Sequence, residues 1–170
     1  MALKDTPDGK IGDAGQLRLA DYLPYRLAVT SNLVSRLVAR AYQDAFGVSI
    51  WEWRVLAILG EGVPMTAQSV CDSAAMDKVS VSRAVRSLVG RGLVARHDNT
   101  ADRRSRLLQL TAAGQSLYDA ITPVALEREA ALLDGFDETD AALLAQLLDR
   151  LRASADELAG DAKTPDTPAR

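Results

Sequence analysis

The 170-residue sequence predicts a mainly α-helical protein with one small β-hairpin. Three observations lead to this fold class. Apolar residues recur at helical spacing along much of the chain, capping residues stand where these stretches begin, and two short apolar stretches flank a polar turn near residue 100. With 48% hydrophobic and 25% charged residues, the chain has enough material for one globular domain or for two closely packed lobes.

Two helices are expected at the start of this domain. Pro24 suits a first helical turn, and apolar residues then continue at helical spacing to Gly47, where a helix can end. Ser49 and Glu52 form a capping box, which opens the second helix.

Two shorter helices with a tight junction follow. Thr66 is placed to cap "AQSVCDSAA" and Asp77 to cap "KVSVSRAVRSLVGR", with only Met76 between the small residues of one helix and the cap of the next. This junction predicts a helix-turn-helix. The second helix has an apolar stripe formed by Val81, Val85, Leu88 and Val89. Its other face carries Val79, Ser80, Ser82, Arg83 and Arg86, and is therefore available for contact with a partner.

A hairpin is predicted after the helix-turn-helix. "LVARH" has the apolar bias of a strand, Leu108 and Leu110 mark a second strand, and the polar segment "DNTADRRS" forms the turn between them. The addition of a hairpin makes the lobe a winged helix, with Arg103 and Arg104 in its loop and Arg106 at the start of the returning strand.

The last predicted elements are two helices, capped by Thr111 and Asp137. The final helix carries more leucine than it needs to pack on one small lobe, so we expect it to pack against a partner. The net charge is distributed unevenly: residues 66–111 have eight Lys or Arg and four Asp, a net of +4, whereas the rest of the chain carries −7. A basic segment in an acidic chain is typical of a face that approaches phosphates.

Several classes of function are excluded by the residues that could carry chemistry. A single cysteine, Cys71, and a single histidine, His97, allow neither a disulfide nor a common zinc site, and no set of nucleophile and base is apparent. We therefore expect no enzyme, no catalytic residue, no metal and no cofactor. The N-terminus lacks a secretory signal and no apolar segment could span a membrane, which predicts a cytoplasmic protein.

Two motifs in this order resemble the MarR family of dimeric, ligand-responsive transcriptional regulators, over about residues 22–158. "MDKVSVSRAVRSLVGRGLV" is similar to the recognition helix of the family and its exit, and "DRRSRLLQLT" followed by "AAG" is similar to the wing. The resemblance implies a winged helix-turn-helix at about 49–111 and dimerisation helices at about 22–46 and 112–158. Outside it, the polar, Gly-rich start of the chain predicts a flexible N-terminal arm at 1–20, and its polar, Pro-rich end predicts a disordered tail at 159–170. It also implies a homodimer on a palindromic DNA operator, acting as a repressor.

The DNA-binding residues are expected on the recognition helix, the helix before it and the wing. Polar side chains on a helix in the major groove can reach bases or phosphates, and arginine at a hairpin tip suits the minor groove. The resemblance gives this minor-groove role to Arg104, with Asp102 bracing its guanidinium through a charge-assisted hydrogen bond or, alternatively, serving as a simple turn former. The candidate residues are Thr66, Gln68, Lys78, Ser80, Ser82, Arg83, Arg86, Asp102, Arg103, Arg104 and Arg106. The alternative is a winged-helix protein interaction module that does not bind DNA.

An effector site is expected where six of the eight aromatic residues gather, between residues 22 and 53. In the family the effector pocket lies between the first, second and fifth helices. An aromatic-lined cleft with a few cations would suit a small aromatic acid or its coenzyme A thioester. The candidate effector residues are Tyr25, Arg26, Trp53 and Arg54. The alternative role of these rings is core and dimer packing, and for Trp53 it is a hydrophobic staple with Val48.

Overall fold

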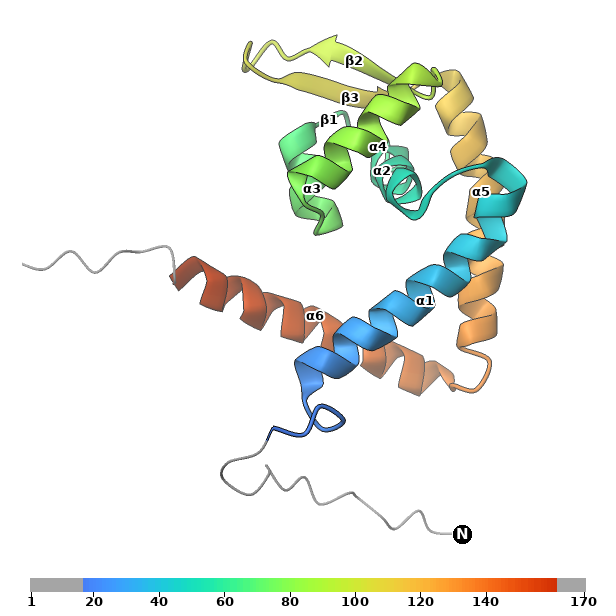
Figure 1. Cartoon of the computed structure of the whole chain (residues 1–170), viewed down its shortest axis with the longest axis vertical. Helices are drawn as coiled ribbons and strands as arrows, with labels where there is room; N and C mark the ends of the chain where they lie inside the picture. The colour runs from blue at the N-terminus through green and yellow to red at the C-terminus, as the bar shows by residue number, and fades with distance from the viewer. Residues whose placement is uncertain (1–16, 162–170) are drawn as a thin grey trace, which may run out of the picture. The chain divides into compact units, whose positions relative to one another are not determined.

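The computed structural model describes residues 17–161 (Figure 1). Its elements in chain order are α1 (Leu23–Phe46), α2 (Ile50–Gly60), β1 (Met65–Thr66), α3 (Ala67–Ala74), α4 (Lys78–Gly90), β2 (Val94–Asp98), β3 (Arg106–Leu110), α5 (Ala112–Leu132) and α6 (Glu138–Asp161). The predicted fold class is confirmed: the protein is mainly helical, with a helix-turn-helix at α3–α4 and a wing at β2–β3.

The described residues divide after Ala125 into two compact units, 17–125 and 126–161. Of the predicted arm, residues 1–16 lie outside the described residues, and so do residues 162–170 of the predicted tail. Helix α6 continues to Asp161, so the described residues 159–161 are helical rather than disordered as predicted.

The predicted caps are all present, because a capping side chain acts on amides only two or three residues away. Oxygens of Ser49, Thr66, Asp77, Thr111 and Asp137 each accept a hydrogen bond of 2.8 to 3.3 Å from an amide in the first turn of the following helix. Ser49 and Glu52 complete the predicted capping box, since the Ser49 amide donates to the Glu52 carboxylate at 2.8 Å. Each helix of the winged lobe therefore starts at a position set by its own sequence.

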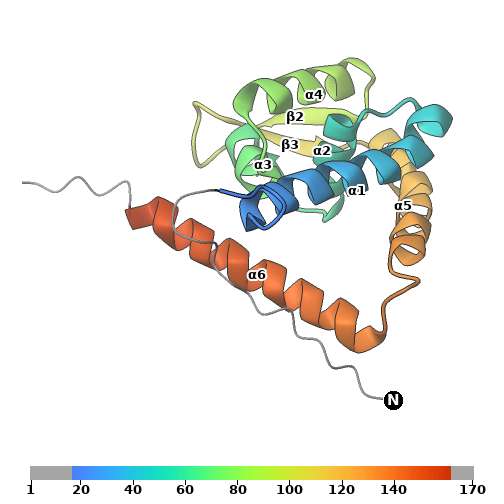
Figure 2. The ribbon, with the colours of Figure 1, turned by 60° about the horizontal axis from the view of Figure 1, so that its bottom comes forward.

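Helix α2 lies at the centre of the first unit. Val55, Leu56 and Leu59 are almost fully buried, and they pack in one cluster with residues of α3, α4 and the sheet. In both views α4 runs alongside the β2–β3 hairpin (Figure 1, Figure 2). The recognition helix and the wing therefore pack on the same hydrophobic core, which holds them in place relative to each other.

The wing belongs to a three-stranded antiparallel sheet in the order β1-β3-β2. Strand β1, which the sequence did not predict, pairs Met65 with Leu108 and Thr66 with Leu107. Thr66 is also the N-cap of α3. One residue therefore joins the sheet directly to the helix-turn-helix.

The start of α5 is closely packed against the exit of the recognition helix. The Thr111 hydroxyl donates to the carbonyl of Gly92 at 2.7 Å, and the Thr111 amide donates to the carbonyl of Leu93 at 3.0 Å. Gly114 is buried here, and a Cβ at this position would overlap the Leu93 carbonyl oxygen and lie 3.0 Å from its carbonyl carbon. The "AAG" that follows the wing therefore has a steric reason for its glycine.

The second unit comprises the last turns of α5 and the whole of α6. The leucines of α6 are exposed in the single chain, as expected for a helix that needs a partner; they are Leu143, Leu144, Leu147, Leu148, Leu151 and Leu158. Neither α6 nor any other helix within residues 17–161 combines the length and apolarity that a membrane crossing requires.

Candidate nucleic-acid interface

The recognition helix α4 has the two faces that its sequence predicts. Val81, Ala84, Val85 and Leu88 are buried, at the spacing of one helical stripe. Ser82, Arg83 and Arg86 are exposed on the opposite side, and Lys78 is exposed at the helix start. The buried stripe holds the helix on the core, so the polar face is free to contact a ligand.

The N-terminus of α4 is closed by its own cap. Asp77 accepts hydrogen bonds from the amides of Val79 and Ser80, each at 2.9 Å, and from the Ser80 hydroxyl at 2.6 Å. The Ser80 hydroxyl and these amides hold the pKa of Asp77 below its ordinary value. Ser80, a predicted DNA contact, is thus half-buried and engaged in the cap, whereas Lys78 is exposed at this end of the helix.

A hollow of about 580 Å³ lies between the helix-turn-helix and the wing. It brings together predicted site residues from four elements, β1, α3, α4 and β3, and from the wing loop. They are Thr66, Gln68, Lys78, Ser82, Asp102, Arg104 and Arg106. Seven of the eleven predicted DNA-binding residues therefore line one hollow, whereas Ser80, Arg83, Arg86 and Arg103 are not part of its lining.

The wing loop is shaped by hydrogen bonds within it. Asp102 accepts from the backbone amide of Arg104 at 3.0 Å, and its carbonyl accepts from the Ser105 amide at 3.0 Å. The expected brace from Asp102 to the Arg104 guanidinium is not among the ion pairs of residues 17–161. The Asp102 carboxylate instead accepts from the backbone in an Asx turn, which is the alternative role that the sequence offered. Asn99 reinforces the loop, since its amide group donates to the Ser105 hydroxyl at 2.9 Å and its carbonyl oxygen accepts from the Ala101 amide at 3.0 Å.

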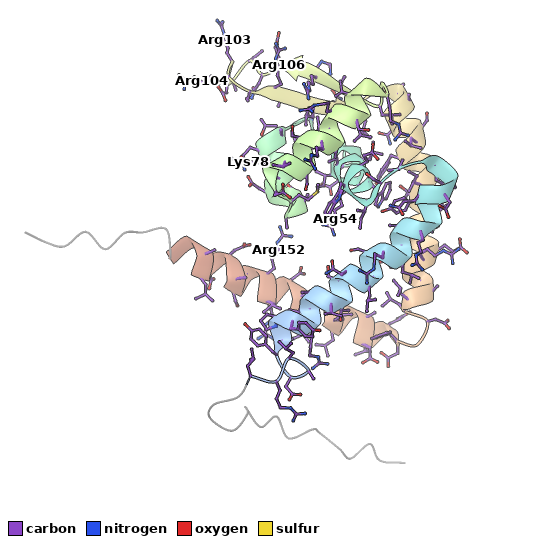
Figure 3. The ribbon with its side chains drawn as sticks, in the orientation of Figure 1. Arg54, Lys78, Arg103, Arg104, Arg106 and Arg152 are labelled. Atoms are coloured by element: carbon purple, nitrogen blue, oxygen red, sulfur yellow. The ribbon has the colours of Figure 1, made fainter. Side chains whose placement is uncertain are left out.

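The three wing arginines have different surroundings. Arg106 begins β3, as predicted, and forms an ion pair with Asp98 across the hairpin. Arg103 and Arg104 project from the hairpin tip, and neither pairs with an acidic side chain among residues 17–161 (Figure 3). The cations available at the tip are therefore Arg103 and Arg104, whereas Arg106 is partly neutralised.

The two predicted DNA-binding residues of the α3 region, Thr66 and Gln68, form hydrogen bonds within the protein. The Thr66 hydroxyl caps α3 and is hydrogen-bonded to Ser69 at 2.9 Å. The Gln68 amide group donates to Asp72 one turn later at 2.9 Å, but both side chains are exposed. Gln68 can exchange this bond for one to DNA at small cost, whereas Thr66 cannot without opening the helix start.

Arg96 is not among the residues that the sequence predicts to bind DNA. It is exposed on β2 and lines the same hollow as Ser82 and Arg104. The period of two along a strand, which puts residues 94, 96 and 98 on one side, could have revealed this placement once the hairpin was located.

Arg91 faces away from this surface. Its guanidinium lies 3.5 Å from the Glu52 carboxylate and donates to the carbonyl of Gly47, which ends α1, at 3.0 Å. The Ser87 hydroxyl of α4 also donates to the Glu52 carboxylate, at 2.6 Å. Burial alone would raise the pKa of Glu52, but hydrogen bonds from Ser87 and Ser49 and the charge of Arg91 outweigh it and lower this pKa. The cluster of Glu52, Ser87 and Arg91 therefore joins α4 to the α1–α2 junction.

The predicted effector residues lie in two places. Trp53 is half-buried, with ring centroids 5.5 Å from Tyr42 and 5.9 Å from Tyr118 on α5. Burial raises the pKa of Tyr42 to about 12, against the smaller lowering effect of Arg54, so its phenol is neutral. Arg54 donates to the Ser35 hydroxyl at 3.4 Å and stands over the Trp51 ring.

Tyr25 and Arg26 are exposed in the first turn of α1. Ser35, which contacts Arg54, lies ten residues further along this helix, or about 15 Å at 1.5 Å per residue. The chain therefore does not bring Tyr25 next to the pair of Trp53 and Arg54.

Charge on the interface is concentrated and weakly compensated. Within the described part of the chain, six of the eight cations of residues 66–111 have no ion-pair partner; they are Lys78, Arg83, Arg86, Arg96, Arg103 and Arg104. A surface with this many uncompensated cations attracts a polyanion and binds it in a salt-dependent manner.

Comparison with known proteins agrees with this geometry. A model described as MarR family matches residues 46–105. The transcriptional activatory protein BadR of Rhodopseudomonas palustris is 29% identical over 98% of both chains. A MarR/EmrR family transcriptional regulator from Acinetobacter sp. ADP1 has a similar structure, with a TM-score of 0.76, 28% identity, and coverage of 83% of this chain and 99% of that one. Bordetella bronchiseptica BpsR, whose DNA binding is regulated by 6-hydroxynicotinic acid, shares the fold at 20% identity, with a TM-score of 0.72 and coverage of 81% and 98%.

The fold, the exposed face of α4 and the basic wing define a winged-helix DNA-binding transcriptional regulator. Such regulators are not enzymes. The chain is similar to regulators of the MarR family, both in the motifs of its recognition helix and wing and in its fold.

Proposed function

We propose that the protein is a homodimeric regulator that binds a palindromic operator through α4 and the wing. The single observation that carries this proposal is the hollow between α3, α4 and the hairpin, which gathers cations from the recognition helix, β2 and the wing. In this arrangement α4 lies in the major groove while Arg103 and Arg104 reach the adjacent minor groove. The resulting half-sites lie about one helical turn, ~34 Å, apart.

The apolar faces of two long helices support a homodimer. In the single chain Leu33, Val34 and Leu37 of α1 are exposed, and so are the leucines of α6. Exposed apolar surface of this extent marks a protein–protein contact, and a two-fold pair of identical subunits matches a palindrome.

Arg104→Ala is expected to weaken operator binding and to flatten its salt dependence by about one ion for each wing. The guanidinium is at the hairpin tip and has no acidic partner in the described part of the chain, so its charge is available to DNA phosphates (Figure 3). Operators are first selected from random duplexes with the wild-type protein, and affinities are then measured from 50 to 200 mM salt. Arg128→Ala, an exposed arginine of α5, is the control and should leave the slope unchanged.

One outcome would contradict the role of the wing, and another would contradict DNA binding as a whole. A salt slope that Arg104→Ala leaves intact excludes the wing from the DNA contact. If the wild-type protein shows no salt-dependent DNA affinity at all, the fold serves instead as a protein interaction module.

We propose that the operator complex represses transcription and that a small aromatic acid or its coenzyme A thioester releases it. Trp53 stacks on Tyr118 and is tilted against the buried Tyr42. The adjacent Arg54 stands over the exposed Trp51 ring, and this combination of a cation and aromatic rings suits an aromatic carboxylate. A second candidate is activation from the same operator, which the activatory role named for BadR favours. Transcription from a template with the selected operator, measured with and without protein, distinguishes the two.

An effector that binds the folded protein is expected to raise its Tm in a screen of aromatic acids and coenzyme A thioesters. Arg54→Ala should abolish most of that rise, because it removes the cation next to the rings. Arg40→Ala, an exposed arginine of α1, should respond like the wild type. An equal rise in the Tm of the Arg54→Ala protein would show that the effector does not bind next to Arg54 on α2.

A further inference from the structure

Val79 is an exposed apolar side chain on the polar face of the recognition helix. It is the second residue of α4, and 58% of it is accessible. Val79, Ser82, Arg83 and Arg86 follow the spacing i, i+3, i+4 and i+7, which places them on one face, opposite the buried stripe. The same face thus presents one isopropyl group together with two guanidinium groups and a hydroxyl.

Stability does not account for a valine at this position. An exposed helix position is served better by Ala, Lys or Glu, because β-branched side chains lose rotamer freedom in a helix. Val79 is also outside the core cluster that holds α4 in place. A residue that has a low helix propensity and gains no burial in the core is expected at a position where function requires it.

The geometry at the start of α4 makes Val79 a rigid contact group. Asp77 fixes its backbone by accepting from its amide at 2.9 Å, and a helical valine has one strongly preferred χ1 rotamer. Its neighbour Ser80 is turned to the cap. In helix-turn-helix proteins the N-terminal residues of the recognition helix are those that meet base edges.

We propose that Val79 contacts the 5-methyl group of a thymine in the major groove and is thereby a specificity-determining residue. The thymine methyl is the apolar group that the major groove presents, and apolar side chains recognise it by excluding water. This inference rests on the proposed function, because it requires α4 to bind duplex DNA. With this contact, α4 recognises one defined base, a thymine, through an apolar side chain, whereas its other exposed side chains on this face are polar or charged.

The test uses the operators selected with the wild-type protein, in which each thymine in turn is replaced by deoxyuridine. This exchange removes only the methyl group. Loss of one buried methyl should weaken wild-type binding roughly fourfold at one thymine per half-site, and roughly fifteenfold when both half-sites are changed. The Val79→Ala protein should bind the thymine operator correspondingly less well and should not distinguish thymine from deoxyuridine at that position.

The controls separate failure of this inference from failure of the proposed function. Val63→Ala changes an exposed valine outside α4 and should keep the wild-type response to deoxyuridine. Alanine is the stronger helix former, so Val79→Ala is expected to fold. If wild type and Val79→Ala respond equally to every deoxyuridine, DNA binding stands and the role of Val79 is overturned. If no duplex is enriched in the selection, both proposals are overturned.

Discussion

Gly114→Ala is expected to lower the free energy of unfolding by about 3 kcal/mol, at the upper end of the usual cost of overpacking. The added Cβ would overlap the carbonyl oxygen of Leu93, which is backbone and cannot turn aside as a side chain can. The same carbonyl accepts the Thr111 amide at 3.0 Å, so moving it weakens the junction between β3 and α5 as well. Urea unfolding at a fixed protein concentration measures the change.

Gly90→Ala is the matched control for this substitution. Gly90 is the last residue of α4, and a Cβ there would meet nothing within 4 Å. Alanine should therefore stabilise the protein slightly, by up to about 1 kcal/mol, since it restricts the unfolded chain. A Gly114→Ala protein as stable as the wild type would show that α5 can shift away from Leu93 without loss.

Glu52→Gln is expected to lower the free energy of unfolding by about 2 kcal/mol at pH 7. The substitution removes the charge that accepts from the Ser49 amide and the Ser87 hydroxyl, and charged hydrogen bonds of this kind contribute about 1.5 to 3 kcal/mol each. It also leaves Arg91, which is partly exposed, without its carboxylate. Glutamine retains the shape of the side chain and one acceptor oxygen, which limits the loss.

The pH dependence of the Glu52→Gln protein provides a second, independent measurement. Because the folded protein lowers the pKa of Glu52 below 4.5, its carboxylate stabilises the fold fully above that value. This stabilisation is lost as the pH falls through the folded pKa. The difference between wild type and Glu52→Gln should therefore be constant at neutral pH and narrow in acid. A difference that does not depend on pH would mean that the carboxylate charge contributes nothing.

Glu61→Gln is the control for the pH series. Glu61 is exposed at the end of the same helix, where a negative charge gains nothing from the helix dipole. Its substitution should change stability by no more than about 0.5 kcal/mol.

The sequence predicted those features that depend on neighbouring residues. The caps at Thr66 and Asp77 act across two or three positions, so a reading of the chain locates the helix-turn-helix to within a residue. The stripe of Val81, Val85 and Leu88 is likewise a local pattern, and these residues are buried.

Features that depend on distant residues could not be predicted in this way. Strand β1 has only two residues and is defined by its pairing with Leu107 and Leu108, far along the chain. Arg91 meets Glu52 across 39 positions, and no spacing rule connects them. For Asp102 the sequence indicated the right neighbour, Arg104, but could not tell its backbone amide from its guanidinium.

The strand order of the wing determines where a foldable fragment can end. The MarR family match stops at residue 105, one residue before β3 begins. A fragment with that end would keep β1 and β2 but lose the middle strand, which is the pairing partner of both. An end at Leu110 would restore the sheet, yet it would omit the bonds from Thr111 to Gly92 and Leu93 that close the exit of α4. The smallest fragment of this chain that folds by itself with α4 and the wing in place must therefore include the first turn of α5, through Gly114.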